Sequence, residues 1–311
     1  MPKNDHFPPE GFGSSGTFCL EELRRAAEEK TVLEGLVLRC DQNHDLHLSL
    51  NGIHGILPRN EVCAPWISGA EREISALSRV GKSVAFTVER ITSDAKGAPL
   101  VCLSRKKSQE EAMAYFLEQL QPGDVLSCRV THLAPFGAFL DIGRGIVALL
   151  PLESISVSRI PHPGVRFHTG QKILAVVSAI DPDRRRITMS HKELLGTWME
   201  NASLFQPGET VPGIVRTVMD YGSFIELSPN LSGLTDRTEG LHCGDAVSVY
   251  IKSIQPQRMK IKLHVIEQLP PPEEPIPFHY QITDGPLHRW VFSPPNYLKD
   301  AVETVFKEAC P

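Results

Sequence analysis

Two pairs of aromatic residues with the same spacing are the side chains of this sequence best suited to bind a ligand. Phe136 and Phe139 flank Gly-Ala, Tyr221 and Phe224 flank Gly-Ser, and each pair leads into a strand-like run. An aromatic ring stacked on an unpaired base contributes about 1–3 kcal/mol and accepts any base, because every base has a π-face. The glycine between the rings lets a base or a backbone approach closely. The pairs therefore indicate binding of single-stranded nucleic acid.

Basic side chains near the aromatic pairs are candidates for binding phosphate, since arginine and lysine bind phosphate and arginine can also stack on rings. They are Arg144, Arg184 and Arg186, which follow the first pair along the chain, and Lys260 and Lys262, which follow the second. Two alternatives remain open from the residues alone. One ring of each pair could be buried, because Phe136 and Phe139 do not follow the strict two-residue period of a strand face. The arginines around Arg184 could belong to a solvated hairpin turn.

No pattern of residues predicts catalysis or a bound cofactor. The sequence has no recognisable Ser/His/Asp set, no paired acids in a phosphodiesterase arrangement and no phosphate-binding loop. Gly11 to Gly16 resembles a dinucleotide motif, but no strand is predicted before it. His44 and His47 lack a third ligand at metal-site spacing. We therefore predict a protein that is not an enzyme and that takes neither a cofactor nor a metal.

Each aromatic pair lies in a module that occurs more than once. Pro122 and Pro207 open the two modules with Pro-Gly-acid, and they are offset by the same 85 residues as Phe136 and Tyr221. Such a fixed offset indicates a repeat of whole modules. A degenerate copy precedes them, in which Leu57-Pro58 parallels Leu150-Pro151.

Turn residues and alternating apolar positions predict five short strands in each module. In the module from 122 to 193, the expected strands cover 125–131, 138–142, 147–150, 172–179 and 186–190. Five strands in about 70 residues are typical of a small Greek-key barrel of the OB type. The predicted fold is mainly β, with three five-stranded OB-fold barrels in tandem joined by short helices.

The predicted domain organisation follows from these modules and from the segments between them. It comprises a flexible tail and short helix (1–30, with the helix at 20–30), a degenerate OB-type repeat (31–107), a connector helix (108–121), a second repeat (122–193), a connector helix (194–206, with helical pattern over 191–205), a third repeat (207–269), and a Pro-rich spacer with a C-terminal docking element (270–311). In this last segment we expect a hairpin over 278–292 and an amphipathic helix over 296–309.

Composition and charge place the chain among cytoplasmic proteins without a membrane partner. Its 41% hydrophobic residues include no apolar run near the roughly 20 residues that span a bilayer. Its seven cysteines form no Cys-x-x-Cys pair, which fits thiols in a reducing compartment. The net charge is −5, yet residues 30–107 hold 11 basic against 8 acidic side chains and residues 122–193 hold 9 against 6. This distribution predicts modest, salt-sensitive binding to a polyanion.

The order of these landmarks resembles the S1 RNA-binding domain family, most closely over residues 122–193. The resemblance rests on Pro-Gly-Asp at 122–124, the phrase from Phe136 to Gly143, and the run from Ile180 to Ser190. In that family the RNA face is formed by two aromatics, a histidine on the next strand and a basic residue on the last strand. The resemblance therefore implies RNA contact by the two aromatic pairs, Arg186 and Lys260.

The sequence departs from the family pattern at several of these positions. Pro151 stands in the place of the family histidine, and the third module reads Gly-Leu-Thr-Asp at 233–236 there. The first module carries Asn43 and Leu46 where the aromatic pair is expected. The first module is therefore predicted to contact protein instead of RNA.

The sequence as a whole predicts a non-enzymatic protein of the cytoplasm that binds single-stranded RNA. We expect a role in translation, with mRNA and the small ribosomal subunit as partners, and a protein partner at residues 31–107 or 278–311. Two other interpretations stay open. One is a protein-interaction scaffold whose barrels have lost RNA binding, and the other is an accessory subunit in RNA turnover.

Overall fold

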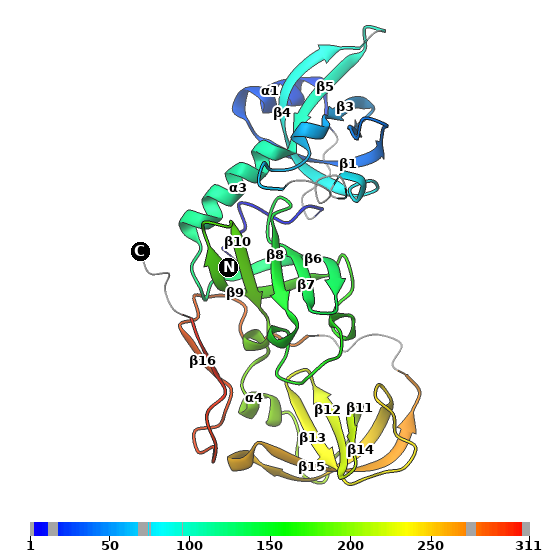
Figure 1. Cartoon of the computed structure of the whole chain (residues 1–311), viewed down its shortest axis with the longest axis vertical. Helices are drawn as coiled ribbons and strands as arrows, with labels where there is room; N and C mark the ends of the chain where they lie inside the picture. Colours follow the sequence, from blue (N-terminus) through cyan, green and yellow to red (C-terminus); the bar gives the residue numbers. More distant parts are fainter. Residues whose placement is uncertain are drawn as a thin grey trace.

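The computed structural model describes residues 3–11, 18–67, 74, 76–94, 96–271 and 278–306. Over these residues the chain forms three closed five-stranded barrels, which follow one another along the long axis of the molecule (Figure 1). The predicted mainly-β fold of three barrels in tandem is confirmed.

All three barrels share one strand order. The first consists of β1 (Val32–Cys40), β2 (Leu46–Leu50), β3 (Ile53–Leu57), β4 (Ser83–Ser93) and β5 (Pro99–Ser104). The second consists of β6 (Val125–Ala134), β7 (Gly137–Asp141), β8 (Val147–Pro151), β9 (Lys172–Asp181) and β10 (Arg186–Ser190). The third consists of β11 (Thr210–Met219), β12 (Gly222–Ser228), β13 (Leu231–Thr235), β14 (Ala246–Gln255) and β15 (Lys260–Leu269). In each barrel the first three strands form an antiparallel meander, and the third strand pairs in parallel with the fifth.

Alternation along the strands fills each barrel with apolar side chains. In the second barrel, for example, Val130, Leu140 and Val177 are fully buried, while the residues next to them on each strand are more exposed or face other elements. Each first strand also carries a bulge at the same place, after Val37, Val130 and Val215. A bulge re-aims the following side chains and increases the local twist, which helps a short sheet to close.

The helices between the barrels differ in one respect from the prediction. Helix α1 (Leu20–Glu29) begins at a capping box, and α3 (Arg105–Gln119) joins the first two barrels with Ser104 as its N-cap. The second connector is not one helix over 191–205. It consists of the 3-10 turn η4 (Lys192–Leu195) and the short α4 (Trp198–Ala202). Gly196 has φ 83° and interrupts the helix, and Thr197 starts a new capping box with Glu200.

The N-terminal segment packs against the second barrel, so the prediction of a flexible tail is wrong for residues 3–11. Asn4 Nδ2 donates to the carbonyl oxygens of Ser127 (2.8 Å) and Ile142 (2.5 Å). Phe7 is buried in the core of the second barrel, with its ring centroid 5.8 Å from that of Phe116. Residues 12–17, which include most of the glycine-rich motif, lie outside the described residues.

The carboxylate of Glu10 joins the first barrel, α3 and the second barrel. It accepts hydrogen bonds from Arg105 Nε (2.6 Å) and Nη2 (2.9 Å) and from the amide of Ala85 (3.1 Å), while its own amide donates to Asp141 Oδ2 (2.9 Å). Burial acts to raise the pKa of Glu10, but the charge and hydrogen bonds of Arg105 outweigh it and lower that pKa. Burial and the neighbouring Glu10 charge raise the pKa of Asp141 to about 7.

The C-terminal segment forms neither the predicted hairpin over 278–292 nor a helix within the described part of 296–309. Instead, β16 (Arg289–Val291) pairs with β17 (Glu303–Val305) and runs along one side of the molecule beside α4 (Figure 1). Pro294 and Pro295 follow the first of these strands, and proline favours a turn over a helix interior. The predicted spacer at 272–277 and the end of the chain from 307 lie outside the described residues.

This C-terminal segment docks on its own chain. Trp290 and Phe292 are buried in the core of the third module, and Phe278 packs against the second. The amide of Trp198 also donates to the carbonyl of Phe292 (2.9 Å). The segment therefore contacts both the second and the third module, whereas Leu298, Val302 and Val305 of the expected helix are exposed. In the part of the chain that the structure describes, no helix is long and apolar enough to cross a bilayer.

Candidate nucleic-acid interface

The two aromatic pairs lie at the surface of the second and third barrels in the same arrangement. Phe136, in the turn before β7, is 59% exposed, and its ring is perpendicular to that of the half-buried Phe139 at a centroid distance of 5.9 Å. Tyr221, in the turn before β12, is 66% exposed and perpendicular to Phe224 at 6.5 Å. Because the first ring sits in a turn, the two-residue period does not bury either member. Each pair therefore offers two ring faces to a ligand.

The glycine within each pair serves the approach of two strands. A Cβ atom on Gly137 would lie 2.4 Å from the carbonyl oxygen of Leu150, and one on Gly222 would lie 2.1 Å from that of Thr235. Any larger residue would separate the second strand of the barrel from the third. The lack of a side chain at this glycine thus allows the close strand pairing of the sheet on which the second ring lies.

The register of the strands sets which side chains share the face with the second ring. Phe139 pairs with His132 on β6 and Leu149 on β8, and Leu149 pairs with Thr188 on β10. The same row in the third barrel is Thr217, Phe224, Leu234 and Lys262. Side chains directly opposite each other on neighbouring strands lie on one face of the sheet. Lys262 therefore shares the face of Phe224, whereas the second barrel has Thr188 at that position.

His132 is a further candidate for this interface that the sequence did not indicate. It is exposed, and its ring lies 5.9 Å from that of Phe139 at an interplanar angle of 33°. An imidazole next to a stacking ring can itself stack on a base. Only the pairing register after the bulge at Val130 brings His132 beside Phe139, so no local sequence signal marks it.

The basic candidates fall into two groups. Arg186 and Lys260 are exposed at matching positions at the start of β10 and β15, and Arg184 is 74% exposed in the turn before β10, where it lies 3.9 Å from the Asp181 carboxylate. Arg184 thus lies in a solvated hairpin turn, as one of the two alternatives expected, and is also accessible to phosphate.

Arg144 lies away from this face. Its Nη1 donates to Glu111 Oε2 (2.6 Å), and its guanidinium lies 4.2 Å from the ring centroid of Phe7. The side chain is only 13% exposed. Its contacts with the N-terminal segment and α3 hold Arg144 in place, so we do not expect it to contact RNA.

The first barrel has histidines where the other two have aromatic pairs. The prediction that Asn43 and Leu46 occupy these two positions is wrong by one residue. His47 pairs with Arg39 and with Ile56, as Phe139 and Phe224 pair in their barrels, and His44 precedes it by three residues. Leu46 is fully buried in the core. The turn that leads into β2 shifts the register relative to a simple alignment of the sequences.

The histidine face of the first barrel is closed by its own contacts. His47 is 8% exposed, and its Nδ1 lies 2.8 Å from His54 Nε2, with the two rings stacked at 5.1 Å. Its Nε2 lies 3.0 Å from Asp41 Oδ2. Burial and the nearby charges of His47 and Arg39 lower the pKa of His54. Among the described residues, no three His, Cys, Asp or Glu side chains gather as a metal site.

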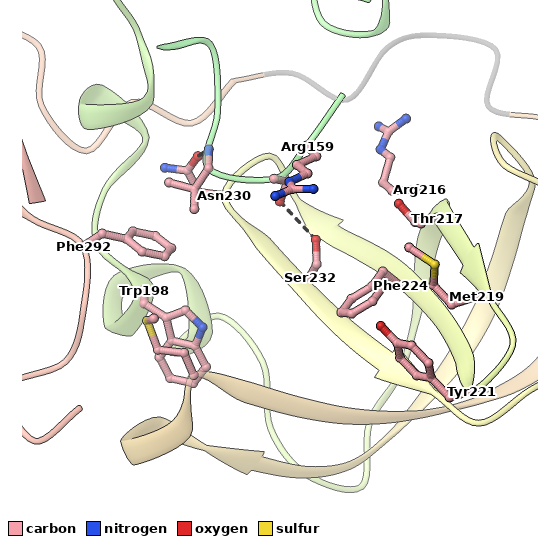
Figure 2. Close-up of a pocket in the computed structure, with 13 residues that line it drawn as sticks. Arg159, Trp198, Arg216, Thr217, Met219, Tyr221, Phe224, Asn230, Ser232 and Phe292 are labelled. Atoms are coloured by element: carbon pink, nitrogen blue, oxygen red, sulfur yellow. Dashed lines mark hydrogen bonds between the residues drawn. The ribbon is translucent and has the colours of Figure 1, made fainter. Parts of the chain in front are cut away.

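A pocket of about 450 Å³ lies beside the aromatic pair of the third barrel (Figure 2). Side chains of the third barrel, of α4 and of the C-terminal segment line it, together with residues of the loop after β8 in the second module. Its lining includes Ser158, Arg159, Arg216, Met219, Tyr221 and Phe224.

Behind this pocket, the buried Glu226 carboxylate joins the second module to the third. It accepts a hydrogen bond at Oε1 from Arg166 Nη1 (2.7 Å), and Arg166 Nη2 donates to Oε2. Arg216 Nε and Nη2 donate to the same carboxylate at 3.0 Å each. Two guanidinium groups therefore share one carboxylate, and the cluster keeps a net charge of +1.

Comparison with known proteins connects this architecture to a described family. The S1 RNA binding domain matches residues 119–192. The chain is 31% identical over 247 residues to the small ribosomal subunit protein bS1 of Leuconostoc lactis, covering 74% of this chain and 55% of that protein. It is 27% identical over 268 residues to the bS1 homolog of Bacillus subtilis, covering 80% of this chain and 67% of that protein. The chain thus spans between about half and two thirds of the length of these relatives.

Among solved structures, the similarity extends over most of the chain at low identity. A multidomain protein with nucleic acid binding domains from Streptococcus pneumoniae matches at 14% identity and a TM-score of 0.25, covering 76% of this chain and 73% of that one.

Proposed function

Residues 119–192 of this chain belong to the S1 RNA-binding domain family, and we propose that the chain binds single-stranded RNA without catalysing a reaction. The second and third barrels hold the RNA through Phe136, Phe139, Tyr221 and Phe224. Bases stack on these rings, and Arg184, Arg186, Lys260 and Lys262 contact phosphates.

The observation that carries this proposal is the repetition of one exposed ring arrangement. Two adjacent barrels each present a perpendicular pair, with centroid distances of 5.9 Å and 6.5 Å. A large exposed aromatic costs free energy in water, so two such pairs at the same strand positions indicate a bound partner. Stacking on rings and salt-dependent contacts to the backbone together favour single strands of any sequence.

The proposed setting is translation in the cytoplasm, with mRNA as the bound RNA and the small ribosomal subunit as a partner. It is supported by the similarity to proteins named small ribosomal subunit protein bS1. Sedimentation of native extracts through sucrose gradients tests this part. Absence of the chain from ribosomal fractions at low salt would remove the ribosomal setting and leave the RNA proposal in place.

RNA binding itself is tested by fluorescence anisotropy with labelled single-stranded RNA. The variant Phe136→Ala/Phe139→Ala/Tyr221→Ala/Phe224→Ala is expected to bind about 30-fold more weakly or worse, because at least two stacked bases lose roughly 1–3 kcal/mol each. Tyr250→Ala is the matched control, since Tyr250 is an exposed aromatic on β14, away from the pairs. Equal affinity of the quadruple variant and the control would refute the stacking proposal.

A protein-interaction scaffold is the second candidate, and the first barrel favours it. There the face is closed by the His47–His54 contact, while Leu36 and Leu38 on β1 are exposed. Exposed apolar side chains next to each other on a strand can contact a protein partner. If wild-type protein binds no RNA at about 50 mM salt, where contacts to phosphate are strong, the scaffold function replaces RNA binding.

A further inference from the structure

The pocket beside the third aromatic pair combines residues of two modules in one site. Tyr221, Phe224 and Met219 come from the third barrel, and Ser158 and Arg159 come from the loop after β8 of the second module. Figure 2 shows Arg159 and Arg216 across from the rings of Phe224 and Tyr221. A ligand on these rings would therefore be within reach of a side chain from the neighbouring module.

We propose that this pocket binds one nucleotide of the RNA on the third barrel, and that Arg159 of the second module binds its phosphate. The inference rests on the proposed function and adds a contact across the module boundary. The base lies against Phe224 and Tyr221, and the phosphate faces the guanidinium of Arg159.

The loop that carries Arg159 is fixed to the third barrel. Ser158 Oγ lies 3.0 Å from Ser232 Oγ on β13, and the amide of Val157 donates to Asn230 Oδ1 at 2.9 Å. Asn230 Nδ2 in turn donates to the carbonyl of Lys192 at 2.8 Å. Because these contacts already fix the loop, it does not need to become ordered when a ligand binds, and the entropic cost of binding is lower.

The charge of the pocket selects an anionic ligand. Its lining contains Arg159 and Arg216 and no Asp or Glu. Arg216 shares the Glu226 carboxylate with Arg166, so this buried cluster retains one positive charge. Arg159 is exposed, and within the described residues no carboxylate lies at ion-pair distance from it. An arginine without a protein counter-ion is well placed to bind phosphate.

The size and the rings of the pocket fit one nucleotide. About 450 Å³ lies within the range of roughly 300–1,000 Å³ that is typical of small-ligand sites. The half-buried ring of Phe224 and the side chain of Met219 supply the apolar surface that a base covers. A peptide could pack against the rings, but it has no phosphate for Arg159 to bind.

The experiment measures the affinity of the full chain for labelled single-stranded RNA as a function of salt. Arg159→Gln is expected to weaken binding about tenfold or more, because loss of one charged hydrogen bond costs about 1.5–3 kcal/mol. The slope of log K against log salt should become less steep by about 0.7, because one phosphate contact is lost. Arg24→Gln removes the same charge from the exposed face of α1 in the first module, and it should change neither quantity beyond a small general effect.

A double-mutant cycle with Phe224→Ala locates the contact. If Arg159 and Phe224 hold the same nucleotide, the loss in the double variant will be smaller than the product of the two single losses. Wild-type protein that binds no RNA would overturn the proposed function and this inference with it. Wild-type protein that binds, with a weakened Phe224→Ala variant but with Arg159→Gln equal to Arg24→Gln in affinity and slope, would overturn the pocket alone.

Discussion

Lowering the pH from 7 to 5 is expected to loosen the C-terminal segment from the second barrel. The fully buried imidazole of His191 sits in a chain of hydrogen bonds between the two. The amide of Leu174 donates to the Tyr280 oxygen (3.2 Å), the Tyr280 hydroxyl lies 3.1 Å from His191 Nε2, and His191 Nδ1 lies 2.9 Å from the Ile155 carbonyl. The carbonyl requires a proton on Nδ1, so Nε2 accepts from the hydroxyl. A second proton on Nε2 would leave the hydroxyl proton without an acceptor.

The size of the effect follows from the pKa of His191. Burial lowers this pKa to about 4 from the ordinary value of 6.5, against a smaller opposite effect of the Ile155 carbonyl. Below pH 6.5 the unfolded state therefore binds more protons than the folded state, and stability falls as the pH drops toward 4. At about 1.4 kcal/mol for each unit of pKa, the loss is about 2 kcal/mol at pH 5 and about 3 kcal/mol in total. A loss of about 2 kcal/mol corresponds to a roughly 30-fold rise in the opening equilibrium.

Hydrogen exchange measured by mass spectrometry can follow this opening locally. The amides of Gln281 and Leu287 donate to carbonyls of Leu194 (2.8 Å) and Gly123 (2.9 Å), so their protection reports docking of the segment. After correction for the intrinsic effect of pH on exchange, protection should fall about 30-fold from pH 7 to pH 5.

Two variants separate His191 from other titrating groups. His191→Gln cannot take up the proton, so its protection is expected to be lower at pH 7 but nearly independent of pH. His168→Gln alters an exposed histidine of the same module and should behave as wild type. The same pH dependence in wild type and in His191→Gln would refute the reasoning.

Three further predictions concern other contacts. Glu10→Gln should lower the free energy of unfolding by about 3–5 kcal/mol, because it leaves buried guanidinium groups without their counter-charge; a urea midpoint equal to that of the exposed-site control Asp5→Asn would contradict this. Glu226→Gln should likewise speed amide exchange in β12 by loosening the joint between the second and third modules, and unchanged exchange would count against the joint. Arg184→Gln should reduce the salt slope of RNA binding by about 0.7, whereas Arg144→Gln should leave it unchanged, so equal slopes would show that the two arginines are wrongly assigned.

The sequence was sufficient for the barrels and for the aromatic pairs because both depend on local signals. Alternating apolar residues place strand faces, and Pro-Gly-acid turns mark where each module begins. The repeat at 85 residues then shows that Phe136 and Tyr221 hold equivalent positions. The strand patterns and the turns can be read within a few residues of the elements they describe, and the repeat needs only a comparison of two stretches of sequence.

Pairing between strands decided what the sequence could not. A shift of one residue in the first barrel places His47 on the outer face and Leu46 in the core, because strand side chains alternate between faces. In the second barrel, the pairing of β6 with β7 brings His132 next to Phe139, although the two residues belong to different strands.

The sequence by itself determined three barrels and which of them carry the aromatic pairs. Tertiary structure alone decided how the barrels are joined, since the contacts involved connect residues far apart in the chain. Arg105 of α3 donates to Glu10, 95 residues away, and Arg166 of the second module donates to Glu226 of the third, 60 residues away. Such contacts form only after the folded modules lie next to each other, and no local pattern of residues encodes them.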